Sequence, residues 1–228
     1  MSQVKNGVHI NFPTDDVFAA ACAAFRINGA YLKDTVFDDK GEVVSYSNRT
    51  TLVRLLSENV DKINKITDED RTQGKLVRQY YQGLIFKIIG GKYISDFDRT
   101  AIECASLEKI EGHLQVSVIA SLPKCYIASK QRDNAEIKLL NATVEHIGKI
   151  GDKVTLTIEV LRSIYSRNYN RYYITAITDD NKTVFFSYSK AAKIGDKMKI
   201  KGTVKTHSTE YSGSKYTRLN RVIIVENL

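Results

Sequence analysis

Apolar and polar residues follow two different periods along this chain, and the period changes near residue 141. Before that point, apolar side chains recur every three or four residues, which is the spacing of one face of an α-helix. Leu76, Tyr80, Leu84 and Ile88 form one such series. After it, apolar residues alternate with Thr, Glu and Lys, a period of two that is typical of a half-buried strand. We therefore divide the chain at Asn141/Ala142 into two domains, 1–141 and 142–228.

Residues 1–141 are predicted to form a mainly helical domain. Start signals that contain Ser, Thr and Asp, together with Gly-containing stop signals, separate five helical segments. The expected helices are 17–27, 48–60, 68–89, 96–109 and 123–140, with Pro123 opening the last, and a small hairpin is expected within 36–46. The small apolar residues of Ala19–Ala24 suit close helix packing, either inside the domain or between subunits.

Residues 142–228 are predicted to form five strands, with a break between the third and the fourth. The expected strands are 154–160, 171–178, 183–189, 197–205 and 217–225, and the break is 190–195. This order is that of an OB-fold, a five-stranded Greek-key barrel, and a small SH3-like barrel is the main alternative. The predicted fold class is therefore α+β, a helical domain followed by a C-terminal OB-fold barrel.

The net charge is divided unevenly between the two domains. The chain has 34 Lys and Arg against 26 Asp and Glu, a net charge of +8. Residues 142–228 hold 15 basic and 8 acidic residues, whereas residues 1–141 hold 19 and 18. The excess indicates a polyanionic partner for the barrel domain; a basic surface without a partner is the alternative.

Two predicted loops interleave aromatic and basic residues. In an OB-fold, ligands contact the second and third strands and the loops that join strands one to two and four to five. These loops are Ser163–Tyr173 and His207–Arg218. Unpaired bases stack on aromatic rings, and Lys and Arg neutralise phosphates, so this chemistry favours a single strand of nucleic acid. The candidate binding residues are Tyr165, Arg167, Tyr169, Arg171, Tyr173, Lys182, Phe185, Tyr211, Lys215, Tyr216 and Arg218.

Strand alternation decides which aromatic residues face outward. It predicts Phe185 on the outer face of the third strand and Tyr173 on that of the second, while a slip of one residue would exchange Tyr172 for Tyr173. The alternative is that these rings belong to the barrel core, because Tyr fits a half-buried pleated surface. A lysine row on the fourth strand, more typical of a solvated face than of a phosphate track, comprises Lys197, Lys199, Lys201 and Lys205.

Signals for catalysis, metals and cofactors are weak. The four histidines lack metal-ligand spacing, and Gly90-Gly91-Lys92 lacks the pattern of a phosphate-binding loop. The three cysteines predict no disulfide framework and favour a reducing compartment. The longest apolar run is far short of the about 20 residues of a membrane span. We therefore expect a cytoplasmic protein that is not an enzyme, with no catalytic residue, metal, cofactor or membrane partner.

The barrel segment Gly151–Val225, with its Tyr/Arg loops and its strands rich in Thr, Val and Ile, resembles OB-fold single-stranded DNA-binding proteins. The full layout resembles those encoded by bacteriophages, with the helical stretches Phe25–Tyr31 and Val77–Leu84 adding to the likeness. The resemblance implies a protein that coats single strands in DNA replication, recombination or repair in the host cytoplasm.

Contacts to partner proteins are expected from the helical domain rather than from an acidic tail. Many proteins of this class recruit replication partners through an acidic tail, whereas Ile223–Leu228 continues the last predicted strand. We expect the helical domain to supply contacts to replication or recombination proteins, or self-association. A replisome adaptor (a helicase-loading or recombination-mediator protein) with weak DNA binding, an RNA-binding OB module and an enzyme acting on nucleic acid remain as alternatives.

Overall fold

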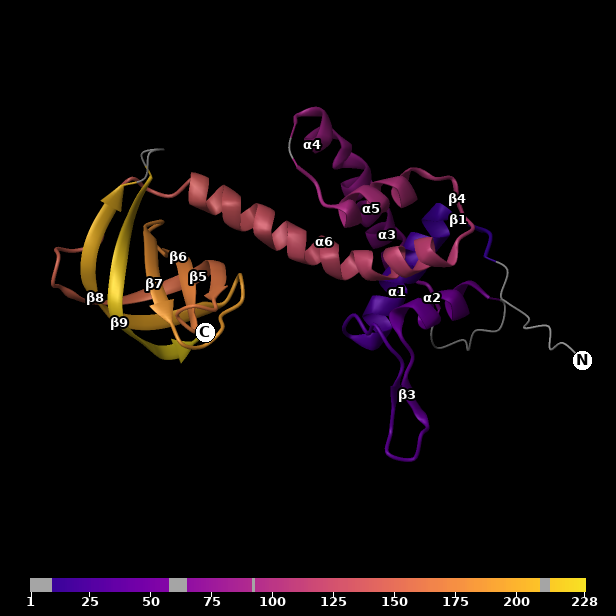
Figure 1. Cartoon of the computed structure of the whole chain (residues 1–228), viewed down its shortest axis with the longest axis horizontal. Coiled ribbons are helices and arrows are strands. Elements are labelled where there is room, and N and C mark those ends of the chain that lie inside the picture. The colour runs from indigo at the N-terminus through magenta and orange to yellow at the C-terminus, as the bar shows by residue number, and fades with distance from the viewer. Residues whose placement is uncertain (1–9, 58–64, 92, 210–213) are drawn as a thin grey trace, which may run out of the picture. The chain divides into compact units, whose positions relative to one another are not determined.

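A helical part and a five-stranded barrel follow one another along the chain (Figure 1). The computed structural model describes residues 10–57, 65–91, 93–209 and 214–228. The chain forms two compact units, Met1–Ile127 and Ala128–Leu228. They divide within a long helix rather than at Asn141/Ala142, where that helix ends.

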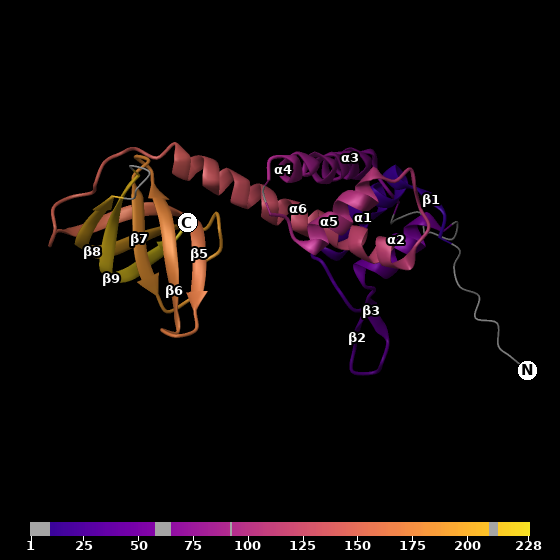
Figure 2. The ribbon, with the colours of Figure 1, turned by 45° about the horizontal axis from the view of Figure 1, so that its top comes forward.

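The first unit contains the helices and two small pairs of strands. The helices are α1 (Thr14–Asn28), α2 (Asn48–Leu56), α3 (Asp68–Gly83), α4 (Ile85–Ile89), α5 (Asp96–Ser106) and the first half of α6 (His113–Leu140). The strands are β1 (Phe12–Pro13), paired with β4 (Lys109–Ile110), and β2 (Val36–Phe37), paired with β3 (Val43–Ser45). The hairpin of β2 and β3 projects away from the helices of its unit in both views (Figure 1, Figure 2).

Local capping explains where α2, α3 and α5 begin. The side chains of Ser47, Thr67 and Ser95 each accept a hydrogen bond from the backbone N–H three residues later. Such a bond satisfies one of the unpaired donors of the first turn. Gly29, with a φ of 65°, ends α1 in the left-handed conformation that glycine adopts at little cost.

Several predicted helix boundaries are wrong. The segment 68–89 divides at Leu84 into α3 and α4, and α5 ends at Ser106 because β4 follows. Helix α2 ends at Leu56, before an extended Ser57, and the predicted end at Val60 lies outside the described residues.

The predicted start of the last helix at Pro123 is also wrong, because Pro123 lies inside α6. Proline removes a helical hydrogen bond and favours the first turn. The turns before Pro123 nevertheless bury Val116, Ile119 and Leu122 in the core of the unit. This apolar packing outweighs the cost of the missing bond.

Helices α1 and α3 pack closely at the centre of the first unit. The stretch Ala19–Ala24 is almost entirely buried, and Gly74 of α3 crosses it. A Cβ atom at Gly74 would lie only 2.7 Å from the backbone nitrogen of Ala19. The small residues predicted to allow close packing therefore do so inside this unit.

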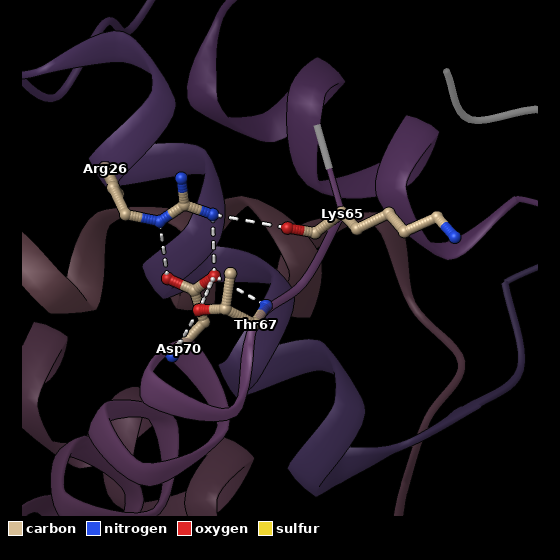
Figure 3. A network of polar contacts seen from close by, with 4 residues as sticks. All are labelled: Arg26, Lys65, Thr67 and Asp70. Carbon is tan, nitrogen blue, oxygen red and sulfur yellow. Dashed lines mark hydrogen bonds and ion pairs between the residues drawn. The ribbon is translucent and has the colours of Figure 1, made fainter. Parts of the chain in front are cut away.

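A buried carboxylate also joins α1 to α3 (Figure 3). Asp70 accepts hydrogen bonds from Arg26 Nε and Nη2 at 3.0 and 2.7 Å, and from the backbone N–H and the hydroxyl of Thr67, both at 2.9 Å. Burial alone would raise the pKa of Asp70, but the hydrogen bonds from Arg26 and Thr67 outweigh it and lower the pKa.

The second unit is a closed barrel with the strand order β5-β6-β7-β9-β8 (Figure 2). Its strands are β5 (Lys153–Ser166), β6 (Arg171–Thr178), β7 (Thr183–Tyr188), β8 (Lys197–Thr209) and β9 (Lys215–Asn227). All neighbours are antiparallel except β7 and β9, which pair in parallel over three residues, and β5 pairs with β8 to close the barrel. The predicted five strands and their order along the chain are confirmed, but their predicted ends are wrong. Because β5 pairs with β6, and β8 with β9, over most of their lengths, β5 continues past Val160 to Ser166 and β8 past Lys205 to Thr209, so both ends of the predicted loops Ser163–Tyr173 and His207–Arg218 belong to strands.

Alternation along the strands fills the barrel with apolar side chains. The buried members are Ile158, Val160, Ile174, Ala176, Val184, Phe186, Met198, Ile200, Val204 and Leu219. The end of α6 adds Ala135 and Leu139, which pack against Leu161 and Ile177 of the barrel. This packing explains why the second half of α6 groups with the barrel rather than with the helices.

Candidate nucleic-acid interface

Four aromatic rings form a continuous line on the outside of the barrel. This aromatic row consists of Tyr169 in the β5–β6 loop, Tyr173 on β6, Phe185 on β7 and Tyr216 on β9. The ring centroids of Tyr173 and Phe185 are 5.9 Å apart with nearly parallel planes, and Phe185 meets Tyr216 edge-on at 6.2 Å. Tyr169 meets Tyr173 edge-on at 6.4 Å. The row therefore runs from the β5–β6 loop to the start of β9.

Strand register determines which rings join this row. Thr175 of β6 lies opposite Phe185 of β7, so Tyr173, two residues from Thr175, shares the outer face with Phe185. Tyr172 instead packs against the barrel core. The prediction that Tyr173 and Phe185 face outward is confirmed, and the slip of one residue that would exchange Tyr172 for Tyr173 does not occur.

Basic side chains accompany the row. The Arg218 guanidinium carbon lies 5.3 Å from the centroid of Phe185, within the range of a cation–π contact. Arg171 is exposed at the start of β6, and Lys215 begins β9 next to Tyr216. Within the described ranges, none of these three cations forms an ion pair, so their charges remain available to an anion.

Four predicted site residues lie apart from the row or beyond description. Tyr165 contacts the ring of Tyr172 and donates a hydrogen bond from its hydroxyl to Asn170 Oδ1 at 2.8 Å. Lys182 forms ion pairs with Glu145 and Asp180, both at 3.1 Å, and these acids raise its pKa. Arg167 is exposed in the β5–β6 turn, and Tyr211 lies outside the described residues.

Comparisons with protein-family models, with curated proteins and with solved structures found no match for this chain. What the barrel surface can bind therefore follows from its own geometry. Among the described residues, no cluster of three His, Cys, Asp or Glu side chains could hold a metal ion. Of the helices in the described part of the chain, none is both long and apolar enough to cross a membrane.

The structure adds two features that the sequence did not single out. His146 and His207 stack with their centroids 4.3 Å apart, and His146 lies near Lys215. Burial, His207 and Lys215 together lower the pKa of His146. The two histidines are far apart in sequence, so no local spacing could have paired them.

The second feature is a basic hollow of about 420 Å³ beside the row. Its charged lining consists of Arg171, Lys205, Arg218 and Arg221. Lys205 belongs to the lysine row that was expected to be a solvated face, and it is indeed exposed. Arg221 was not among the predicted binding residues, because the sequence of one strand does not show where its pairing with the neighbouring strand will be interrupted.

Proposed function

We propose that the barrel is an OB-fold that binds single-stranded DNA across the aromatic row. On this proposal the protein coats and protects single strands in DNA replication, recombination or repair, as the resemblance to bacteriophage proteins implies. The strand order β5-β6-β7-β9-β8, with parallel β7 and β9, supports the OB assignment over an SH3-like barrel. The row also crosses the second and third strands, where OB-folds take oligonucleotides.

The observation that carries the proposal is the continuity of the aromatic row. Tyr169 is exposed and the other three rings are half-buried, and each ring of such a row can take an unpaired base, worth about 1–3 kcal/mol per base. A duplex hides its base faces, so the row favours a single strand. Arg171, Lys215 and Arg218 supply charges for the phosphates, and such contacts make binding dependent on salt.

A titration with three nucleic acids tests the proposal. The protein would be titrated with fluorescently labelled single-stranded DNA, single-stranded RNA and duplex DNA, and anisotropy would report binding. The chain has no Trp, so quenching of Tyr fluorescence gives a second readout of stacking. We expect tight binding to single-stranded DNA, weaker binding to the duplex and a steep loss of affinity with salt. Equal affinity for RNA would favour the RNA-binding alternative.

Two substitutions in the row sharpen the test. Tyr173→Ala and Phe185→Ala should each weaken single-strand binding by about 1–3 kcal/mol, or about 5- to 150-fold. Tyr93→Ala is the matched control, because Tyr93 is an exposed tyrosine of the helical unit. If both row variants keep a folded circular-dichroism spectrum and bind as well as the control, the proposed interface is wrong.

A protein-adaptor role is the second candidate, favoured by apolar side chains on the surface of the helical unit. Phe37 and Val44 are exposed on the β2–β3 hairpin, and Phe86, Ile89 and Tyr93 are exposed on and after α4. Grouped apolar exposure is typical of protein interaction sites. Capture of one stoichiometric replication or recombination protein, combined with little affinity for DNA, would favour this role.

A further inference from the structure

The basic hollow opens where β7 and β9 part. These strands pair only from Thr183 to Phe185 on β7, and beyond Phe185 the chains diverge. The hollow is lined by Arg171, Ser187, Tyr188, Ser189, Lys205, Arg218, Leu219, Asn220, Arg221 and Val222. Four of these residues are basic and none is acidic, while the serines and the asparagine add hydrogen-bonding groups.

The cations that line the hollow have no acidic partner among the residues that the structure describes. Arg171, Lys205, Arg218 and Arg221 form no ion pair with any described residue, unlike Lys182, which has two acidic neighbours. Four like charges around one hollow repel one another. An anion within the hollow would relieve this repulsion, and phosphate, with several acceptor oxygens, fits guanidinium donors well.

A bulge in β9 places Arg221 at the hollow. Opposite Gly202 of β8, β9 has two residues, Arg221 and Val222, instead of one. Arg221 has a φ of 52°, in the left-handed region that side chains other than those of Gly, Asn and Asp rarely adopt. Bulges of this kind re-aim side chains and occur beside binding sites. The strained backbone is therefore the cost of directing a cation to this position.

We propose that the hollow binds phosphate groups of the strand that stacks on the aromatic row, with Arg221 and Lys205 as contacts additional to Arg171 and Arg218. This inference rests on the proposed function, since Arg218 lies both over Phe185 and in the lining of the hollow. The proposed interface then includes both the rings, which bind the bases, and the hollow, which neutralises the phosphate backbone of the same DNA strand.

The test compares Arg221→Gly with Arg221→Lys and with Lys199→Ala, a control that removes an exposed β8 lysine outside the hollow. Glycine adopts the left-handed conformation freely, so Arg221→Gly should fold at least as stably as the parent. Binding of labelled single-stranded DNA would be measured over a range of sodium chloride concentrations. For Arg221→Gly we expect affinity to fall equally for all sequences and the slope of log K against log salt to decrease in magnitude by about 0.7. Arg221→Lys should restore most of the slope, and Lys199→Ala should keep it.

The outcomes separate this inference from the proposed function. If the parent binds no single strand, both fail. If Phe185→Ala weakens binding while Arg221→Gly retains the parental affinity and slope, the aromatic interface stands and the phosphate site is overturned. Inorganic phosphate should compete with the strand in the parent and compete less in Arg221→Gly; phosphate that binds at the hollow without displacing the strand would overturn the inference in favour of a free-anion site.

Discussion

The Asp70 carboxylate should be the most sensitive polar group of the helical unit. Its side chain is only 4% exposed, and it accepts four hydrogen bonds, two of them from Arg26. Asp70→Asn keeps the shape but removes the charge and turns an amide donor toward the Arg26 donors or Thr67. Removing one partner of a fully buried pair costs about 3–5 kcal/mol. Because Arg26 is half exposed and can be hydrated, we expect a loss of about 2–3 kcal/mol.

A matched control exists on the same two helices. Asp16 of α1 pairs with Arg71 of α3 at 3.0 Å, but both side chains are about half exposed. Asp16→Asn should therefore cost no more than about 0.5 kcal/mol. Urea unfolding followed by circular dichroism at 222 nm, which reports mainly on helices, would measure both losses.

The effect of Asp70 should also depend on pH. Its pKa in the folded protein lies below the ordinary value of 3.8, so folding favours the ionised form. The stabilisation is then complete above pH 3.8 and is lost as the pH falls through the lower folded-state pKa. The gap between the parent and Asp70→Asn should be largest at neutral pH and should close in acid. A loss no greater than that of Asp16→Asn, or a gap independent of pH, would refute this account.

Two further predictions concern packing and protonation. Gly74→Ala should destabilise the helical unit by about 2 kcal/mol in the same urea assay, because its Cβ would meet the backbone of Ala19. Gly83→Ala is the control and should leave the stability unchanged, since the space around Gly83 is open. Equal stability of the two variants would contradict the close packing of α1 and α3. His146 should titrate below its ordinary pKa of 6.5 in proton NMR, so the barrel should be most stable above pH 6.5 and lose stability as the pH falls from there toward the folded-state pKa. A midpoint at or above 6.5 would contradict the assigned surroundings of this histidine.

Much of the barrel was predictable, because the sequence pattern that defines each strand is local. Alternation of apolar and polar residues located all five strands and placed Phe185 and Tyr173 on the outer face. The side-chain period of a strand is two, so a single well-buried neighbour such as Ile174 is enough to orient the rest. The function of those faces stays a prediction.

The remaining features depend on pairing between distant segments. The sequence suggested that the charge of Lys182 was free to bind a phosphate. In the structure Lys182 pairs with Glu145, which lies on a distant segment that no local sequence pattern connects to Lys182. Tyr165 was predicted to lie in the loop between the first two strands, but it belongs to β5 and pairs across the hairpin with Tyr172. Arg221 occupies a bulge that exists only relative to Gly202 on the neighbouring strand. Pro123 remains helical because of tertiary packing that its own sequence signal opposes.

The parallel ladder between β7 and β9 is the shortest seam of the barrel and therefore the place where local opening should begin. Phe185 lies on one side of this seam, and Tyr216 and Arg218 lie on the other. A DNA strand bound across these three side chains would contact both β7 and β9 and hold them together from the outside of the barrel. On binding, amide hydrogen exchange should therefore slow more in the β7–β9 ladder than in the long β8–β9 ladder. The bound nucleic acid would then stabilise the fold of the barrel to which it binds.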